Sequence, residues 1–169
     1  MLRSRYICVR LRNFSNARLF EENLNILYDR KCSLCRVEID FLKKKDGMNK
    51  RLRFTDVENE LFDDRDPENG GVSYEDAMKK IHVITSSGQK ILGVHAIRAA
   101  YDEVGLGWIY SFLSIPFVGA TADIVYDAWA GVRTNITRGE SLDDIFAKRR
   151  KQQDCADRTC NINDIKQQF

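Results

Sequence analysis

The chain is poor in histidine and proline, carries almost no excess of either charge, and has no long apolar run. It contains two histidines and two prolines in 169 residues, and its formal net charge at pH 7 is +2. Neither His82 nor His95 is accompanied by the Ser and Asp pattern of a hydrolytic triad, and a lone strand histidine is usually structural. A charge of +2 is also too small to indicate nucleic-acid binding.

The longest apolar stretch, residues 108–122, is interrupted by Ser111, Ser114 and Pro116. It falls short of the roughly twenty apolar residues that a membrane-spanning helix requires. We therefore expect no transmembrane segment. The stretch instead predicts a pair of core-covering helices that are broken at Pro116.

The first twenty residues are basic and contain no Asp or Glu. Their arginines are Arg3, Arg5, Arg10, Arg12 and Arg18. Interspersed apolar residues complete the composition of a transit peptide, and Arg12-Asn13-Phe14-Ser15 resembles a mitochondrial processing site. Residues 1–20 are thus predicted to be a presequence-like leader for the mitochondrion, with the matrix as destination. The alternatives are a plastid destination or the basic N-terminus of a cytoplasmic protein.

What the chain does contain is a cysteine pair between a strand-like and a helix-like segment. The apolar residues 26–28 lead to Cys32 and Cys35, after which apolar residues recur at spacings of three and four until Gly47. The unpaired N–H groups and the positive dipole at a helix start stabilise a thiolate. We predict that Cys32 is the nucleophile and that Cys35, on the inner side of the helix, resolves a mixed disulfide. The alternative is two half-buried cysteines without a redox role.

Charged side chains surround this pair. Arg30, Lys31 and Arg36 are candidates to stabilise the Cys32 thiolate, as nearby cations do for reactive thiols. Asp29 would oppose them unless it is buried and serves as a proton acceptor for the pair. The simpler interpretation of the basic residues is a solvated face that aids solubility.

Tyr28, Asp29, Cys32 and Cys35 form a Tyr-Asp-x-x-Cys-x-x-Cys motif, with which the chain resembles the DCC thiol-disulfide oxidoreductase-like proteins. Further matching positions are residues 52–57, residues 81–85, Ala96, the Ile115-Pro116 step, Tyr126 and Arg133. The resemblance covers roughly residues 24–135. It implies an α/β fold with a thioredoxin-like central sheet flanked by helices.

The resemblance also implies a thiol-disulfide oxidoreductase of the protein-disulfide reductase type. The dithiol itself carries both electrons, so no cofactor and no metal is expected. The expected partners are a disulfide-containing protein or small thiol substrate and a reducing partner that the sequence does not identify.

Two departures from the family pattern favour a different class of function. Arg30 and Ser33 stand where many members have Gly and Pro. Thioredoxin-like redox proteins also place a cis-proline before the strand that faces the dithiol, whereas this strand opens with residues 79–81 and the prolines are Pro67 and Pro116. The alternative is therefore a redox-inactive thioredoxin-like interaction module or an accessory subunit of an organellar assembly. The intact C-x-x-C motif opposes it.

Residues 136–169 are predicted to add a C-terminal helix, beginning at Ser141, and a polar tail. The tail carries Cys155 and Cys160. The interpretations of these two cysteines are incidental thiols, which we expect, a regulatory or relay dithiol that exchanges with Cys32, and zinc ligands. The long gap between Cys35 and Cys155 is unlike a compact zinc module.

Overall fold

The computed structural model describes residues 18–166, without the side chains of residues 112–114, 116, 120 and 155–166. The predicted leader therefore lies almost entirely outside the described residues.

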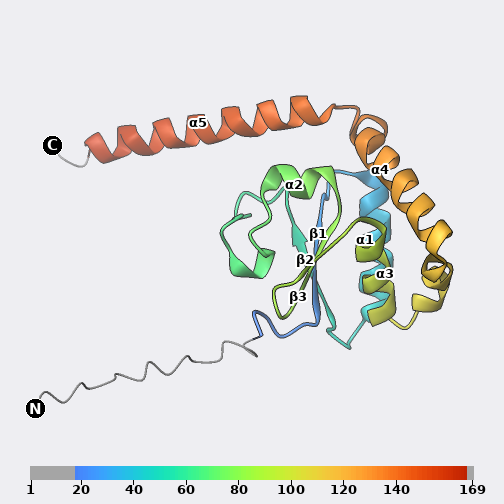
Figure 1. Ribbon diagram of the computed structural model, residues 1–169. Helices are drawn as coiled ribbons and strands as arrows, with labels where there is room; N and C mark the ends of the chain where they lie inside the picture. The colour runs from blue at the N-terminus through green and yellow to red at the C-terminus, as the bar shows by residue number, and fades with distance from the viewer. Residues whose placement is uncertain (1–17, 167–169) are drawn as a thin grey trace, which may run out of the picture.

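A mixed four-stranded sheet forms the centre of the domain, in the order β2-β1-β3-β4 (Figure 1). Its strands are β1 (Leu24–Tyr28), β2 (Leu52–Asp56), β3 (His82–Thr85) and β4 (Lys90–Leu92). β1 is parallel to β2 and antiparallel to β3, so that Ile26 lies between Phe54 and Val83. The α/β class expected from the sequence is confirmed, and the arrangement is consistent with a thioredoxin-like fold.

Helices cover both faces of the sheet. Neighbouring residues of β1 point to opposite faces, and both Ile26 and Leu27 are apolar and buried. The helices in chain order are α1 (Ser33–Asp46), η1 (Pro67–Asn69), α2 (Tyr74–Lys79), α3 (Gly93–Glu103), η2 (Gly107–Ser114), α4 (Pro116–Arg138) and α5 (Leu142–Lys166). On one face, Ile26 belongs to an apolar cluster with Ile39 of α1 and Ala96 of α3. On the other face, Leu27 belongs to a cluster with Met78 of α2. β1 is thus the strand on which both halves of the core depend.

The apolar stretch after residue 107 folds differently from the two core-covering helices predicted for it. The break at Pro116 is confirmed, and Pro116 begins α4 as its first residue. The segment before it is a 3-10 helix, η2. α4 runs along the outer side of α1 and α3 (Figure 1) and leaves Phe117, Ile124 and Ile136 exposed. Its core-covering role is therefore confined to one side of the helix, where Ala130, Arg133 and Thr134 are buried.

The predicted start of the last helix is also found. The N–H of Asp144 donates to the Ser141 hydroxyl at 3.2 Å, which caps the first turn of α5. The predicted polar tail continues this helix to Lys166 instead of forming irregular structure. In the part of the chain that the structure describes, no helix is long and apolar enough to cross a membrane.

Tyr126 joins α4 to the sheet. Its hydroxyl oxygen accepts a hydrogen bond from the N–H of Ile81 at 2.9 Å, just before β3. Its ring also lies against Gly93, where an added Cβ would be 3.5 Å from two ring carbons. Because residues seven positions apart lie on the same side of a helix, this contact helps to place Arg133 two turns further along.

We expect Tyr126→Phe to lower the free energy of unfolding by about 1–3 kcal/mol, because the partly buried Ile81 N–H loses its acceptor. Urea denaturation followed by circular dichroism measures the change. Phe117→Leu is the control, since Phe117 is 87% exposed on the same helix and its replacement should cost less than about 0.5 kcal/mol. Equal stability of Tyr126→Phe and the wild type would contradict this role.

Candidate active site

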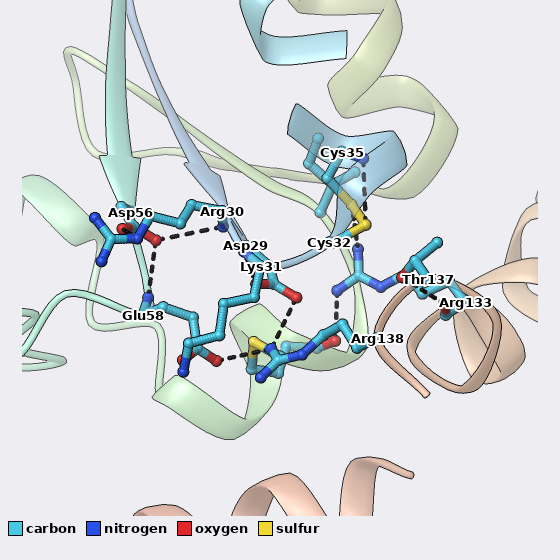
Figure 2. Close-up of a disulfide and its surroundings, with 12 residues drawn as sticks. Asp29, Arg30, Lys31, Cys32, Cys35, Asp56, Glu58, Arg133, Thr137 and Arg138 are labelled. Atoms are coloured by element: carbon cyan, nitrogen blue, oxygen red, sulfur yellow. Dashed lines mark hydrogen bonds and ion pairs between the residues drawn. A yellow bond between two sulfur atoms is a disulfide. The ribbon is translucent and has the colours of Figure 1, made fainter. Parts of the chain in front are cut away.

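The dithiol lies where β1 ends and α1 begins, as the sequence predicts. Cys32 is the N-cap residue of α1, and its Sγ accepts a hydrogen bond from the N–H of Cys35 at 3.2 Å. The two cysteines form a disulfide with a Cα–Cα distance of 5.3 Å (Figure 2). The cap hydrogen bond and the positive end of the helix both favour negative charge on the Cys32 sulfur.

The two cysteines differ in burial, and the more enclosed one is Cys32, the predicted nucleophile. Cys32 is 0% exposed, whereas Cys35 is half-buried and lines a pocket of about 210 Å³. Cys35 does lie on the inner side of α1, one turn before the buried Ile39, but Cys32 is the more enclosed of the two. The physical reason is that Cys32, as the N-cap, turns its side chain back towards the first-turn N–H groups instead of outwards.

Arg133 of α4 is the cation that the structure brings to the dithiol. Its Nη1 lies 3.8 Å from Cys35 Sγ, and its Nη2 donates to the carbonyl oxygen of Met78 at 2.5 Å (Figure 2). The side chain is buried, and desolvation lowers the pKa of the guanidinium. The sequence offered Arg133 only as a position that matches the family, because its partner Cys35 is 98 residues away.

Asp29 is buried in an ion-pair network beneath the dithiol loop. Its Oδ1 accepts the backbone N–H of Lys31 at 2.8 Å, and its Oδ2 pairs with Arg138 at 3.0 Å. The same Arg138 nitrogen pairs with Glu58 Oε1 at 2.8 Å. Arg138 thus bridges two buried carboxylates that follow β1 and β2 (Figure 2). The sequence analysis missed both Arg138 and Glu58, for which no local signal exists.

The carboxylate of Glu58 accepts hydrogen bonds from three side chains. Burial alone raises the pKa of its carboxyl, but hydrogen bonds from Lys31, Arg138 and Tyr74 outweigh burial and lower the pKa from 4.5 to about 2. The Tyr74 hydroxyl donates to Oε1 at 2.8 Å, and Lys31 Nζ lies 2.6 Å from Oε2. Glu58 is therefore ionised throughout the physiological pH range.

Two of the three cations predicted to stabilise the thiolate pair with carboxylates. Arg30 pairs with Asp56 at 3.3 Å, and Lys31 pairs with Glu58. Arg36 is exposed on the first turns of α1. Two of these charges are thus offset by carboxylates at the end of β2. A role for the three in stabilising the thiolate stays a prediction.

Cys155 and Cys160 lie in the part of α5 whose side chains are outside the described residues. Their assignment as an accessory dithiol stays a prediction. Among the described residues, no group of three or more His, Cys, Asp or Glu side chains is arranged to hold a metal ion.

The lowered pKa of Glu58 makes stability depend on pH. Since the pKa of its carboxyl is about 2 in the folded protein and 4.5 for an unperturbed glutamate, its contribution is complete above pH 4.5 and disappears as the pH falls towards 2. We expect Glu58→Gln to remove up to about 3 kcal/mol of this acid dependence. Urea titrations at several pH values in this window measure it. Parallel pH profiles for Glu58→Gln and the wild type would contradict the ion-pair account.

Comparison with known proteins agrees with this geometry. A family model described as DCC1-like thiol-disulfide oxidoreductase matches residues 26–139. An uncharacterized chloroplastic protein of Arabidopsis thaliana is 36% identical over 128 residues, which are 76% of this chain and 59% of that relative. The chain thus spans less than two thirds of the relative's length, and no solved structure matches. The matched region includes the disulfide, Arg133 and Arg138, and the chain belongs to the DCC1-like thiol-disulfide oxidoreductase family.

Proposed function

We propose that this protein is a disulfide reductase that works by thiol-disulfide exchange at the Cys32–Cys35 pair. The observation that carries the proposal is the disulfide at the start of α1, in a chain of this family. In the dithiol form, one thiolate attacks a sulfur of a substrate disulfide and releases one substrate thiol. The second cysteine displaces the other substrate thiol and closes the protein disulfide. The protein loses two electrons and the substrate gains them.

The proposed substrates are disulfides of proteins or of small thiols, and an external thiol donor returns the protein to the dithiol form. The surroundings of the pair support this chemistry because both sulfurs have a donor. Cys32 Sγ accepts the Cys35 N–H, and Cys35 Sγ faces Arg133. Charge-assisted contacts of this kind stabilise the thiolate that each step of exchange produces.

We propose that Asp29 positions the loop that precedes the Cys32–Cys35 pair. Its bond to the Lys31 N–H holds the loop that leads into Cys32, and its pairing with Arg138 keeps the carboxylate buried. The sequence predicted that Asp29 accepts a proton from the cysteine pair. Such a proton would compete with Arg138 for the carboxylate. The contacts instead support a positioning function, which was not predicted from the sequence.

We propose an organelle as the place of action. The basic leader supports import, and the Arabidopsis relative is described as chloroplastic. The mitochondrial matrix and the plastid are the two destinations, and each would supply the thiol donor of its own compartment.

We expect the reduced protein to accelerate reduction of oxidised glutathione by dithiothreitol, and the double variant Cys32→Ser/Cys35→Ser to lose this activity. Because the double variant lacks both the attacking and the resolving thiol, the loss should reach about tenfold or more relative to the wild type. The initial rate at protein concentrations far below that of substrate measures turnover.

The matched control is Cys155→Ser/Cys160→Ser, which removes the same number of thiols and should retain the wild-type rate. Mass spectrometry after alkylation would show the Cys32–Cys35 disulfide in the oxidised wild type. Equal rates for the wild type and the Cys32/Cys35 double variant would reject the reductase and support an interaction module.

A further inference from the structure

We propose that the substrate meets the dithiol at Cys35, inside an apolar pocket that receives an apolar or aromatic group beside the substrate sulfur. The proposal rests on the proposed function and reverses the order of attack expected from the sequence. Cys35 carries the mixed disulfide, and Cys32 resolves it.

Access distinguishes the two sulfurs. Exchange requires a sulfur to approach a disulfide directly, so its rate depends on which sulfur can be reached. Cys32 is fully buried, whereas Cys35 is half-buried and lines the pocket of about 210 Å³. Cys32 does not line that pocket. A substrate therefore reaches Cys35 without displacing any element of the fold.

The lining of the pocket identifies the kind of group that it takes. Its walls come from β1, the segment that precedes β3, α1, α2, α3, η2 and α4, and its larger apolar and aromatic side chains are Leu34, Ile81, Ile97, Tyr110, Tyr126 and Trp129. The volume is below the roughly 300–1,000 Å³ of pockets for whole ligands. The pocket thus suits one apolar or aromatic group, such as a side chain next to a cysteine or the body of a small thiol.

Arg133 supplies the charge that attack at Cys35 requires. It is 6% exposed, and within the part of the chain that the structure describes its Nε has no hydrogen-bond partner and its guanidinium no ion-pair partner. Its Nη1 faces Cys35 Sγ at 3.8 Å. Asp29 acts on Arg133 only beyond ion-pair distance and is itself paired with Arg138. A buried cation without a carboxylate in direct contact favours negative charge beside it, so the Cys35 thiolate is stabilised from the pocket side.

The reaction then balances in two steps. The Cys35 thiolate attacks the nearer sulfur of the substrate disulfide, a bond forms between Cys35 and that sulfur, and the second substrate thiolate leaves and takes up a proton. Cys32 attacks Cys35 Sγ, the Cys32–Cys35 bond forms, and the first substrate thiolate leaves and is protonated. The Cys35 N–H and the start of α1 stabilise Cys32 as the attacking thiolate. An external thiol donor reverses both steps.

Two activated disulfides test which cysteine is attacked and what the pocket prefers. Benzyl 2-pyridyl disulfide and 2-hydroxyethyl 2-pyridyl disulfide release the same thiopyridone, which is followed by absorbance. The variants Cys32→Ser and Cys35→Ser are made in full-length protein that also carries Cys8→Ser, Cys155→Ser and Cys160→Ser. Each therefore retains a single cysteine, and mass spectrometry identifies the adduct.

We expect Cys32→Ser to form a stable mixed disulfide at Cys35 about tenfold faster than Cys35→Ser forms one at Cys32, with the benzyl probe reacting several-fold faster than the hydroxyethyl probe. Faster adduct formation at Cys32 would overturn the proposal. Failure of the proposed function is a different result, because the wild-type pair would then show no turnover with oxidised glutathione whichever single cysteine reacts faster.

Two exposed positions of α1 provide a matched pair of variants that test the pocket. Leu34 lines it and is 52% exposed, whereas Val37 lies on the same helix, is 66% exposed and does not line it. In the Cys32→Ser background, Leu34→Ser should reduce the preference for the benzyl probe, and Val37→Ser should leave it unchanged. Both replacements should change the free energy of unfolding only slightly, because neither side chain is in the core. An unchanged preference in Leu34→Ser would exclude the pocket as the binding site.

Discussion

The structure depends on the return of α4 to the carboxyl end of β1, where Arg138 is buried between Asp29 and Glu58. All three side chains have less than a tenth of their surface exposed. Two buried carboxylates would repel each other and lose hydration, and the bridging guanidinium, together with Lys31 on Glu58, offsets both charges. Removal of the bridge would leave carboxylates without a partner, which is far more costly than loss of a surface ion pair.

This bridge has consequences for the dithiol. Asp29 lies three residues before Cys32, so the ion pair fixes the loop that sets the start of α1. α4, which carries Arg138, also carries Arg133, whose bond to the Met78 carbonyl attaches α4 to the end of α2 and whose other nitrogen faces Cys35. Stability and the proposed chemistry thus depend on the same few residues. A change that loosens α4 should affect both the fold and the reactivity of the pair.

Local features of the sequence were sufficient for much of the fold. Gly47 ends α1 with a positive φ, and Ser141 caps α5 as expected; Ser73 caps α2 in the same way. The position of the cysteine pair at a helix start also follows from local pattern. These features could be predicted because each depends on residues that lie only a few positions apart in the sequence.

The remainder required tertiary contacts. Arg133 and Arg138 act on residues about a hundred positions earlier, and no spacing in the sequence connects them. Arg30 was assigned to the thiolate by proximity in sequence, but it pairs with Asp56, because the parallel neighbour β2 ends beside the same loop. The burial of Cys32 depends on the direction of its side chain at the N-cap. The spacing of the two cysteines does not determine that direction.

The reduction potential of the Cys32–Cys35 pair tests most directly whether α4 supplies the cation that governs the dithiol. Equilibration with glutathione at mildly alkaline pH should give Arg133→Met a more negative potential than the wild type, because the reduced form loses the cation that stabilises its thiolate. A shift of about 30 mV corresponds to about 1.4 kcal/mol. Lys44→Met, at an exposed cation further along α1, should leave the potential unchanged. An unchanged potential in Arg133→Met, or a negative shift in Lys44→Met alone, would contradict the account.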